Sequence, residues 1–132
     1  MPGDVVLQDG IRMSLESGRS VAADASVPDA DVNLLSHAHG DHLYRKAPAT
    51  IGSSSLTLDL AEHRRPDQSR PAVDETTDVT MLPAGHVFGS RAFLIEDERR
   101  YLYTGDCSVR DRFSLPGLDP PEAEVLIVES TY

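Results

Sequence analysis

The sequence has one cysteine and no long apolar run. Cys107 alone cannot form an internal disulfide, so the chain does not require an oxidising compartment. No apolar stretch approaches the roughly 18 residues that a membrane span needs, and residues 1–4 lack the basic and apolar regions of a signal peptide. We therefore expect a cytoplasmic protein without a membrane partner.

Positive charge is also scarce. There are 12 basic against 22 acidic residues, the formal net charge is -10, and Lys46 is the only lysine. Repulsion between the like charges of such a chain is screened within about 3 Å at 1 M salt. The composition therefore favours a halophilic protein in a salt-rich cytoplasm, and the alternative is an ordinary acidic protein. An acidic surface repels nucleic acid, so a polynucleotide substrate would be recognised largely through bound metal.

Short apolar segments between turn signals predict a mixed fold, α/β or α+β, with helices packed outside one or two sheets. Residues 5–23 predict a β-meander, because Asp9-Gly10 and Ser17-Gly18 are turn signals. The strands are expected at residues 5–7, 11–15, 20–23, 32–35, 79–82, 92–95, 100–104 and 125–128. The last of these is typical of a strand covered on both faces.

One helix is predicted after the serines at 53–55, which can cap its start. Leu56, Leu60 and Ala61 have the spacing of its apolar face, and it should end at 63–65 before Pro66. His63 is then a solvated residue at the helix end rather than a metal ligand. Residues 66–77 are polar and are expected to form a loop.

Four predicted strands are each followed closely by an imidazole or a carboxylate. These residues are His37, His86, Asp106 and Glu129. Sites in sheet proteins commonly form beyond the carboxyl ends of strands, where the strands fix positions and the ends stay open to substrate. We therefore expect the four side chains to converge.

The densest group of possible ligands lies in Leu34–Leu43, with His37, His39, Asp41 and His42. In an extended segment the first two histidines point the same way and could hold one ion, while the next pair could face a second. Nitrogen and oxygen donors without thiolate suit zinc best, with manganese or iron as alternatives. Two such ions activate water and polarise a phosphoryl or carbonyl oxygen, which predicts metal-assisted hydrolysis. The alternative is a surface loop without a metal.

Three motifs resemble those of the metallo-β-lactamase fold superfamily, in the same order. They are His-Ala-His-Gly-Asp-His at 37–42, Pro-Ala-Gly-His-Val-Phe-Gly-Ser at 83–90 and Tyr-Thr-Gly-Asp at 103–106. With Glu-Ser-Thr-Tyr at 129–132, they are most similar to the β-CASP nucleases, which include archaeal mRNA 3′-end processing factors. The resemblance covers about residues 5–132 and implies the N-terminal half of an αββα sandwich.

The resemblance also implies six metal ligands and two zinc ions in a complete site. One ion would be held by His37, His39 and His86, the other by Asp41 and His42, with Asp106 between them. Asp41 and Glu129 are the catalytic candidates, since Glu129 matches the acidic residue of the first β-CASP motif. A capping or solvated carboxylate at a strand end is the alternative for Glu129. Cys107 is interpreted as a packed thiol, and Arg110 and Arg112 as exposed residues or phosphate contacts.

Members of this group continue with a β-CASP domain and the second half of the metallo-β-lactamase fold, which supplies another zinc-binding histidine and a proposed general acid. We therefore expect residues 1–132 to form a partial domain with an incomplete second zinc site, exposed apolar surface or an unpaired strand edge, and little or no nuclease activity alone. A truncated product, half of a split enzyme and a degenerate subunit all remain open, as does completion by another chain or by a homodimer.

The function predicted is that of a zinc-dependent RNA nuclease of the mRNA 3′-end processing or exonuclease type. A DNA exonuclease of the same superfamily, such as the ligase-associated type acting on single-stranded DNA, is the main alternative. A small-molecule hydrolase of the glyoxalase or lactonase sort and a non-catalytic metal-binding subunit are the others.

Overall fold

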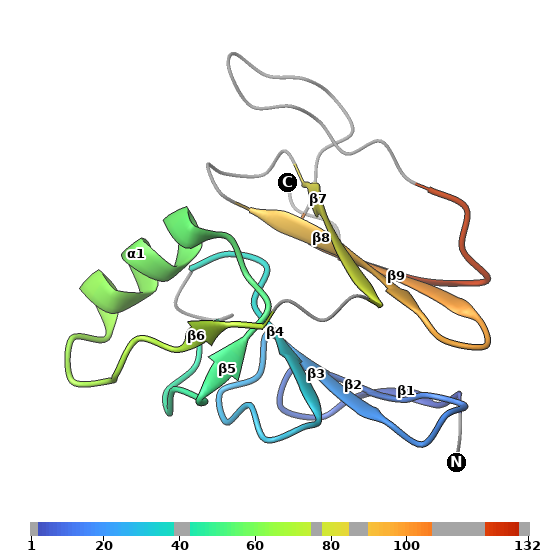
Figure 1. Ribbon diagram of the computed structural model, residues 1–132, viewed down its shortest axis with the longest axis horizontal. Helices are drawn as coiled ribbons and strands as arrows, with labels where there is room; N and C mark the ends of the chain where they lie inside the picture. The colour runs from blue at the N-terminus through green and yellow to red at the C-terminus, as the bar shows by residue number, and fades with distance from the viewer. Residues whose placement is uncertain (1–2, 39–42, 75–77, 85–89, 107–120, 130–132) are drawn as a thin grey trace.

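The computed structural model describes residues 3–38, 43–74, 78–84, 90–106 and 121–129. Two four-stranded sheets face one another, and helix α1 lies beside a short third sheet (Figure 1). The N-terminal sheet has the order β1 (Val5–Leu7), β2 (Ile11–Ser14), β3 (Ser20–Ala23) and β4 (Val32–Leu34). The C-terminal sheet has the order β10 (Val125–Glu129), β9 (Arg100–Asp106), β8 (Arg91–Glu96) and β7 (Val79–Pro83). The predicted mixed fold class is confirmed.

The third sheet pairs β5 (Thr50–Ile51) with β6 (Ala72–Val73) and was not predicted. Each strand has two residues, too few to show a periodic pattern in the sequence. The prediction that residues 66–77 form a loop is therefore wrong at β6. The other predicted strands are all present, and most of them differ by only one or two residues at their ends.

Strand direction brings particular strand ends together. The first three strands form the predicted antiparallel meander, whereas β3 pairs with β4 in parallel. Likewise β8 and β9 form an antiparallel pair, and β9 and β10 a parallel one. Because the carboxyl ends of parallel strands meet at one edge, β4 ends beside β3, and β10 ends beside β9.

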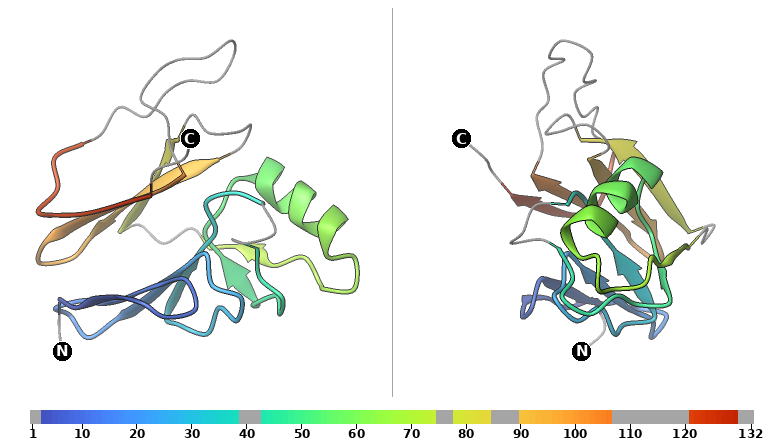
Figure 2. Two further views of the ribbon diagram at one scale, coloured as in Figure 1. Left: turned by 180° about the vertical axis from the view of Figure 1, so that it is seen from behind. Right: turned by 90° about the vertical axis from the view of Figure 1, so that its left-hand side faces the viewer.

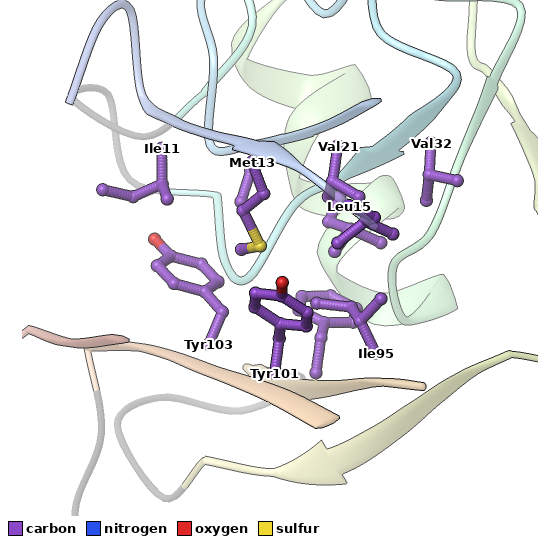
Figure 3. Close-up of a cluster of buried hydrophobic side chains, with 11 residues drawn as sticks. Ile11, Met13, Leu15, Val21, Val32, Ile95, Tyr101 and Tyr103 are labelled. Carbon is purple, nitrogen blue, oxygen red and sulfur yellow. The ribbon is translucent and has the colours of Figure 1, made fainter. Parts of the chain in front are cut away.

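The main core lies between the two large sheets. Ile11, Met13 and Val21 of the N-terminal sheet face Tyr101 and Tyr103 of the C-terminal sheet (Figure 3). Alternate residues of each strand supply these side chains, which is the period of a strand with one face inward. Full burial of each large apolar side chain contributes about 1.5 to 3 kcal/mol, so this layer fixes how the sheets lie on each other.

Helix α1 (Ser55–Arg64) confirms the predicted cap, but of the predicted apolar face only Ala61 packs inward. Ser54 accepts a hydrogen bond from the backbone N–H of Thr57 at 3.2 Å. Leu56 and Leu60 are each 42% exposed, and the side chains that pack inward are Thr57, Leu58 and Ala61.

The spacing of apolar residues did not predict the buried face of α1, because the helix has leucines on more than one side. Tertiary packing buries Leu58. His63 is exposed in the last turn, as expected. Within the part of the chain that the structure describes, no helix has the length and apolar character that a membrane crossing requires.

The two large sheets are also joined by polar contacts at the end where β3 and β9 begin. The backbone N–H of Ser17 donates to Asp97 at 3.0 Å, and the Tyr101 hydroxyl donates to Glu16. Hydrogen bonds from the side chain and the backbone of Ser17 lower the pKa of Asp97, and the one from Tyr101 lowers the pKa of Glu16. Arg19 lies 3.6 Å from the Asp97 carboxylate, whose side chain is only 5% exposed. Figure 2 shows the two large sheets from two further sides.

Strand β10 is at an edge of its sheet and is not covered on both faces, so that prediction was wrong. Val125 and Ile127 pack against the main core, but Leu126 is 60% exposed and Val128 is 54% exposed. A run of four apolar residues gives no alternation from which a half-covered strand could be recognised. The expectation of exposed apolar surface is met here.

Asp9, in the turn between β1 and β2, anchors the segment that follows β3. Its carboxylate accepts hydrogen bonds from the backbone N–H groups of Ser26 at 2.8 Å and Val27 at 3.1 Å, and from the Ser26 hydroxyl. The Ser26 hydroxyl, the Ser26 backbone and, less strongly, Arg12 lower the pKa of Asp9 to about 2. The ionised form of Asp9 is therefore the one that stabilises the fold.

We expect Asp9→Asn to lower the free energy of unfolding by about 1 kcal/mol at pH 7, since the amide weakens hydrogen bonds to a charged, partly exposed acceptor. Because the pKa of Asp9 is lower in the folded state, its contribution is complete above pH 4 and is lost as the pH falls towards 2. Urea titrations of both proteins from pH 7 to pH 2 should show the difference shrinking. An Asp9 difference that stays constant from pH 7 to pH 2 would contradict the assignment.

Candidate metal centre

The predicted site residues fall into three groups in the structure. The His37 side chain is described, and for Asp106 and Glu129 the backbone is described. The remaining site residues lie outside the described part of the chain, as do the other residues interpreted above. These are His39, Asp41, His42 and His86, together with Cys107, Arg110 and Arg112. The ligand set as a whole stays a prediction.

The segments that flank these residues meet at one place. The Ser36 carbonyl, at the end of β4, accepts a hydrogen bond of 2.9 Å from the backbone N–H of Arg91, which begins β8. The N–H of Ala84 donates to the carbonyl of Ser90 at 3.3 Å. Both described ends of the segment that contains His86 are thus held close to the residue before His37.

The ends of β9 and β10 meet the same place. A Cβ atom added to Gly105 would lie 2.6 Å from the Ser36 hydroxyl oxygen, which means that the backbone of β9 lies directly against Ser36. Asp106 and Glu129 are partners in the parallel register of β9 and β10. The described backbone therefore brings together the ends of β4, β9 and β10, and the convergence of the four side chains stays a prediction.

His37 is fully buried, at 0% exposure, beside a polar network that includes a buried carboxylate. Its Nδ1 atom lies 2.9 Å from the Ser36 hydroxyl oxygen. Ser36 donates to Asp24 twice, from its backbone N–H and from its hydroxyl, each at 2.8 Å. The Tyr103 hydroxyl donates to the same Asp24 oxygen as the Ser36 hydroxyl. This network joins β3, β4 and β9 behind the imidazole.

Asp24, Ser36 and Tyr103 were not identified from the sequence as site residues. The signal for Asp24 was present, because it follows the apolar strand β3 just as the predicted ligands follow theirs. Asp24 has φ +54°, a left-handed conformation that aspartate tolerates better than most residues. Only the register of β3 with β4 shows that its carboxylate meets Ser36.

The described residues fit a metal-binding role. Metal-binding histidines usually engage a hydrogen-bonding group through the ring nitrogen that faces away from the ion, and the Nδ1 contact with Ser36 has this form. Within residues 3–38, 43–74, 78–84, 90–106 and 121–129, no three possible ligand side chains gather. The other predicted ligands lie outside these ranges or have only their backbone described.

Comparisons with known proteins bear on the function. The chain is 24% identical over 171 aligned positions to "Probable RNase MJ4" of Methanocaldococcus jannaschii, covering 97% of this chain and 40% of that protein. It is 28% identical over 152 positions to "Cleavage and polyadenylation specificity factor subunit 3" of Dictyostelium discoideum, covering 83% of this chain and 20% of that protein. These two names support a nuclease or RNA-processing role. They also support the resemblance to β-CASP nucleases.

A third relative is "Probable DNA ligase" of Opitutus terrae. It is 33% identical over 109 positions, covering 76% of this chain and 11% of that protein. The chain thus spans less than half the length of each of these three relatives. No protein-family model matches the sequence.

Proposed function

We propose that the chain is the N-terminal part of a zinc-dependent nuclease of the metallo-β-lactamase fold, β-CASP type, that cleaves RNA phosphodiesters. The observation that carries this proposal is the meeting of the ends of β4, β9 and β10 around the buried His37. The contact of Gly105 with Ser36 and the pairing of Asp106 with Glu129 make up that meeting. The relatives with nuclease and RNA-processing names support the same reaction class.

In this proposal zinc would be held by His37, His39 and His86 at one position and by Asp41 and His42 at a second, with Asp106 shared. Zinc bound there would supply an activated water molecule and polarise a phosphoryl oxygen. The residues of this chain would orient the ions and keep them in a buried environment. His37 is fully buried, and its Nδ1 atom contacts the Ser36 hydroxyl. Asp41 and Glu129 are proposed to act on the reacting groups.

We propose that a complementary chain or a second copy contributes to the second position. The exposed edge strand β10, with Leu126 and Val128 outward, is consistent with such an arrangement. A DNA exonuclease of the same superfamily is the second candidate function. The relative named as a DNA ligase supports DNA as the polymer in this alternative.

Zinc binding tests the metal site directly. We expect the full chain to bind one zinc ion tightly, measured by competition with a chromogenic chelator and by elemental analysis after dialysis. His37→Ala should weaken this binding by at least 100-fold, because it removes one of three ligands. His63→Ala is the matched control, because His63 is exposed at the end of α1. Equal zinc binding by His37→Ala and the unaltered chain would refute the site.

Matched RNA and DNA oligonucleotides of one sequence then test the reaction. The chain alone should cleave either of them weakly or not at all, and light scattering at increasing concentration should show whether a homodimer forms. Robust zinc-dependent cleavage by a monomer would refute the contribution of a second chain. Cleavage of DNA in preference to RNA, by whichever form is active, would favour the second candidate.

A further inference from the structure

The hydrogen-bonding network behind His37 determines which of its two ring nitrogens carries a proton. Ser36 is the link, with its hydroxyl oxygen 2.8 Å from an Asp24 carboxylate oxygen and 2.9 Å from His37 Nδ1. All three residues are buried, and none of the contacts is on the surface of the molecule.

A serine hydroxyl has one proton to donate and lone pairs to accept with, whereas an ionised aspartate accepts only. The short contact between the Ser36 hydroxyl and Asp24 therefore uses the single Ser36 proton. Three donors converge on the two Asp24 oxygens, so Asp24 is the acceptor of the Ser36 proton. Asp24 receives two further hydrogen bonds, from the Ser36 backbone N–H and from the Tyr103 hydroxyl, which keep it in this orientation.

With its proton directed to Asp24, the Ser36 hydroxyl can only accept from His37. The Nδ1 atom must then carry the ring proton, and the lone pair of the neutral imidazole is on Nε2. We propose that Asp24 and Ser36 are positioning residues that fix His37 as the Nδ1-protonated tautomer, so that Nε2 is the atom that binds zinc. The inference depends on the proposed function only for the identity of the ion.

Asp24→Asn is the most informative variant, because it reverses the hydrogen bond between residue 24 and the Ser36 hydroxyl while keeping the shape of the side chain. The amide oxygen is needed by the Ser36 N–H, so the amide nitrogen faces the Ser36 hydroxyl and donates to it. The Ser36 proton is then free to turn to His37 Nδ1. The ring proton should move to Nε2, the nitrogen that binds zinc in this proposal.

The tautomer can be read from nitrogen-15 chemical shifts of the imidazole in the full zinc-free chain. The His37 signals are assigned by their loss in His37→Ala from among the five histidines. We expect Nδ1–H in the unaltered chain and Nε2–H in Asp24→Asn. Ser36→Ala, which removes the link with little change in volume, should give a mixture of the two tautomers.

A further variant is the control. Asp31→Asn alters a similar pair at the start of β3, where Asp31 accepts from the backbone N–H of Ser20 at 2.9 Å and from its hydroxyl at 3.2 Å. This pair is exposed and should leave the His37 signals unchanged.

Zinc titration of the same proteins gives the second measurement. Asp24→Asn and Ser36→Ala should raise the zinc dissociation constant by about 10- to 100-fold, and the Asp31→Asn control should leave it within about threefold. An Nε2–H tautomer in the unaltered chain, or an Nδ1–H tautomer retained in folded Asp24→Asn, would refute the inference. If Asp24→Asn does not fold, Ser36→Ala decides, and an unchanged tautomer there would refute it. A correct tautomer with no nuclease activity in any form would count against the proposed function alone.

Discussion

Gly105→Ala should lower the free energy of unfolding by about 2 to 5 kcal/mol. Gly105 has φ +54°, which costs an L-amino acid about 1 to 2 kcal/mol. Its new methyl group would also lie 2.6 Å from the Ser36 hydroxyl oxygen and 2.7 Å from the Ser36 Cβ atom. Overpacking of this kind in a close-packed interior costs about 1 to 3 kcal/mol more. Urea titration followed by circular dichroism measures the sum.

Gly18→Ala separates the two parts of this effect. Gly18 also has a positive φ, +94°, but no neighbouring atom lies within 4 Å of a Cβ added there. It should lose only the conformational part, about 1 to 2 kcal/mol. Gly105→Ala should in addition weaken zinc binding, because the methyl group displaces Ser36 from His37. Equal stability losses for the two alanine variants would show that β9 does not press against Ser36.

Phe93→Ala should lower the free energy of unfolding by about 3 to 5 kcal/mol, the usual cost of deleting a buried aromatic ring. Phe93 is fully buried in β8, pairs with Tyr103 of β9 and belongs to the core between the two large sheets. Domains of this kind are typically stable by only about 5 to 15 kcal/mol, so this one substitution removes a large share.

Leu126→Ala is the control for Phe93→Ala, because Leu126 is a large apolar residue on the exposed face of β10. It should change the free energy of unfolding by less than about 0.5 kcal/mol. Chemical denaturation of the three proteins under one salt condition makes the comparison. A loss below 1 kcal/mol for Phe93→Ala would mean that the layer between the sheets is not what holds them together.

Local patterns were a good guide to where most elements lie. Turn residues such as Asp9-Gly10 and the Ser54 cap act through their own backbone neighbours, so their effect is visible in a short window of sequence. The same window could not show which leucines of α1 face inward. It also could not show that β10 is covered on one face only, because burial depends on what lies across from a residue in space.

Cytoplasmic location, adaptation to high salt, zinc binding and the roles of Asp41 and Glu129 stay predictions. The chemistry of the candidate site came from the sequence, because residue types and spacing alone identify histidines and carboxylates placed after strands. The tertiary structure decided which backbone segments meet there. Gly105 meets Ser36, and Asp106 pairs with Glu129, through contacts between residues far apart in the chain.

The sequence by itself determined the mixed fold class and the candidate ligands, because these depend on short-range periodicity and on side-chain chemistry. Only the tertiary structure placed Asp24 and Tyr103 behind His37. Their hydrogen bonds depend on the parallel register of β3 with β4 and on the approach of the two sheets, which long-range packing sets. A buried network of this kind has no signature along the chain, because its members are joined through space rather than through sequence.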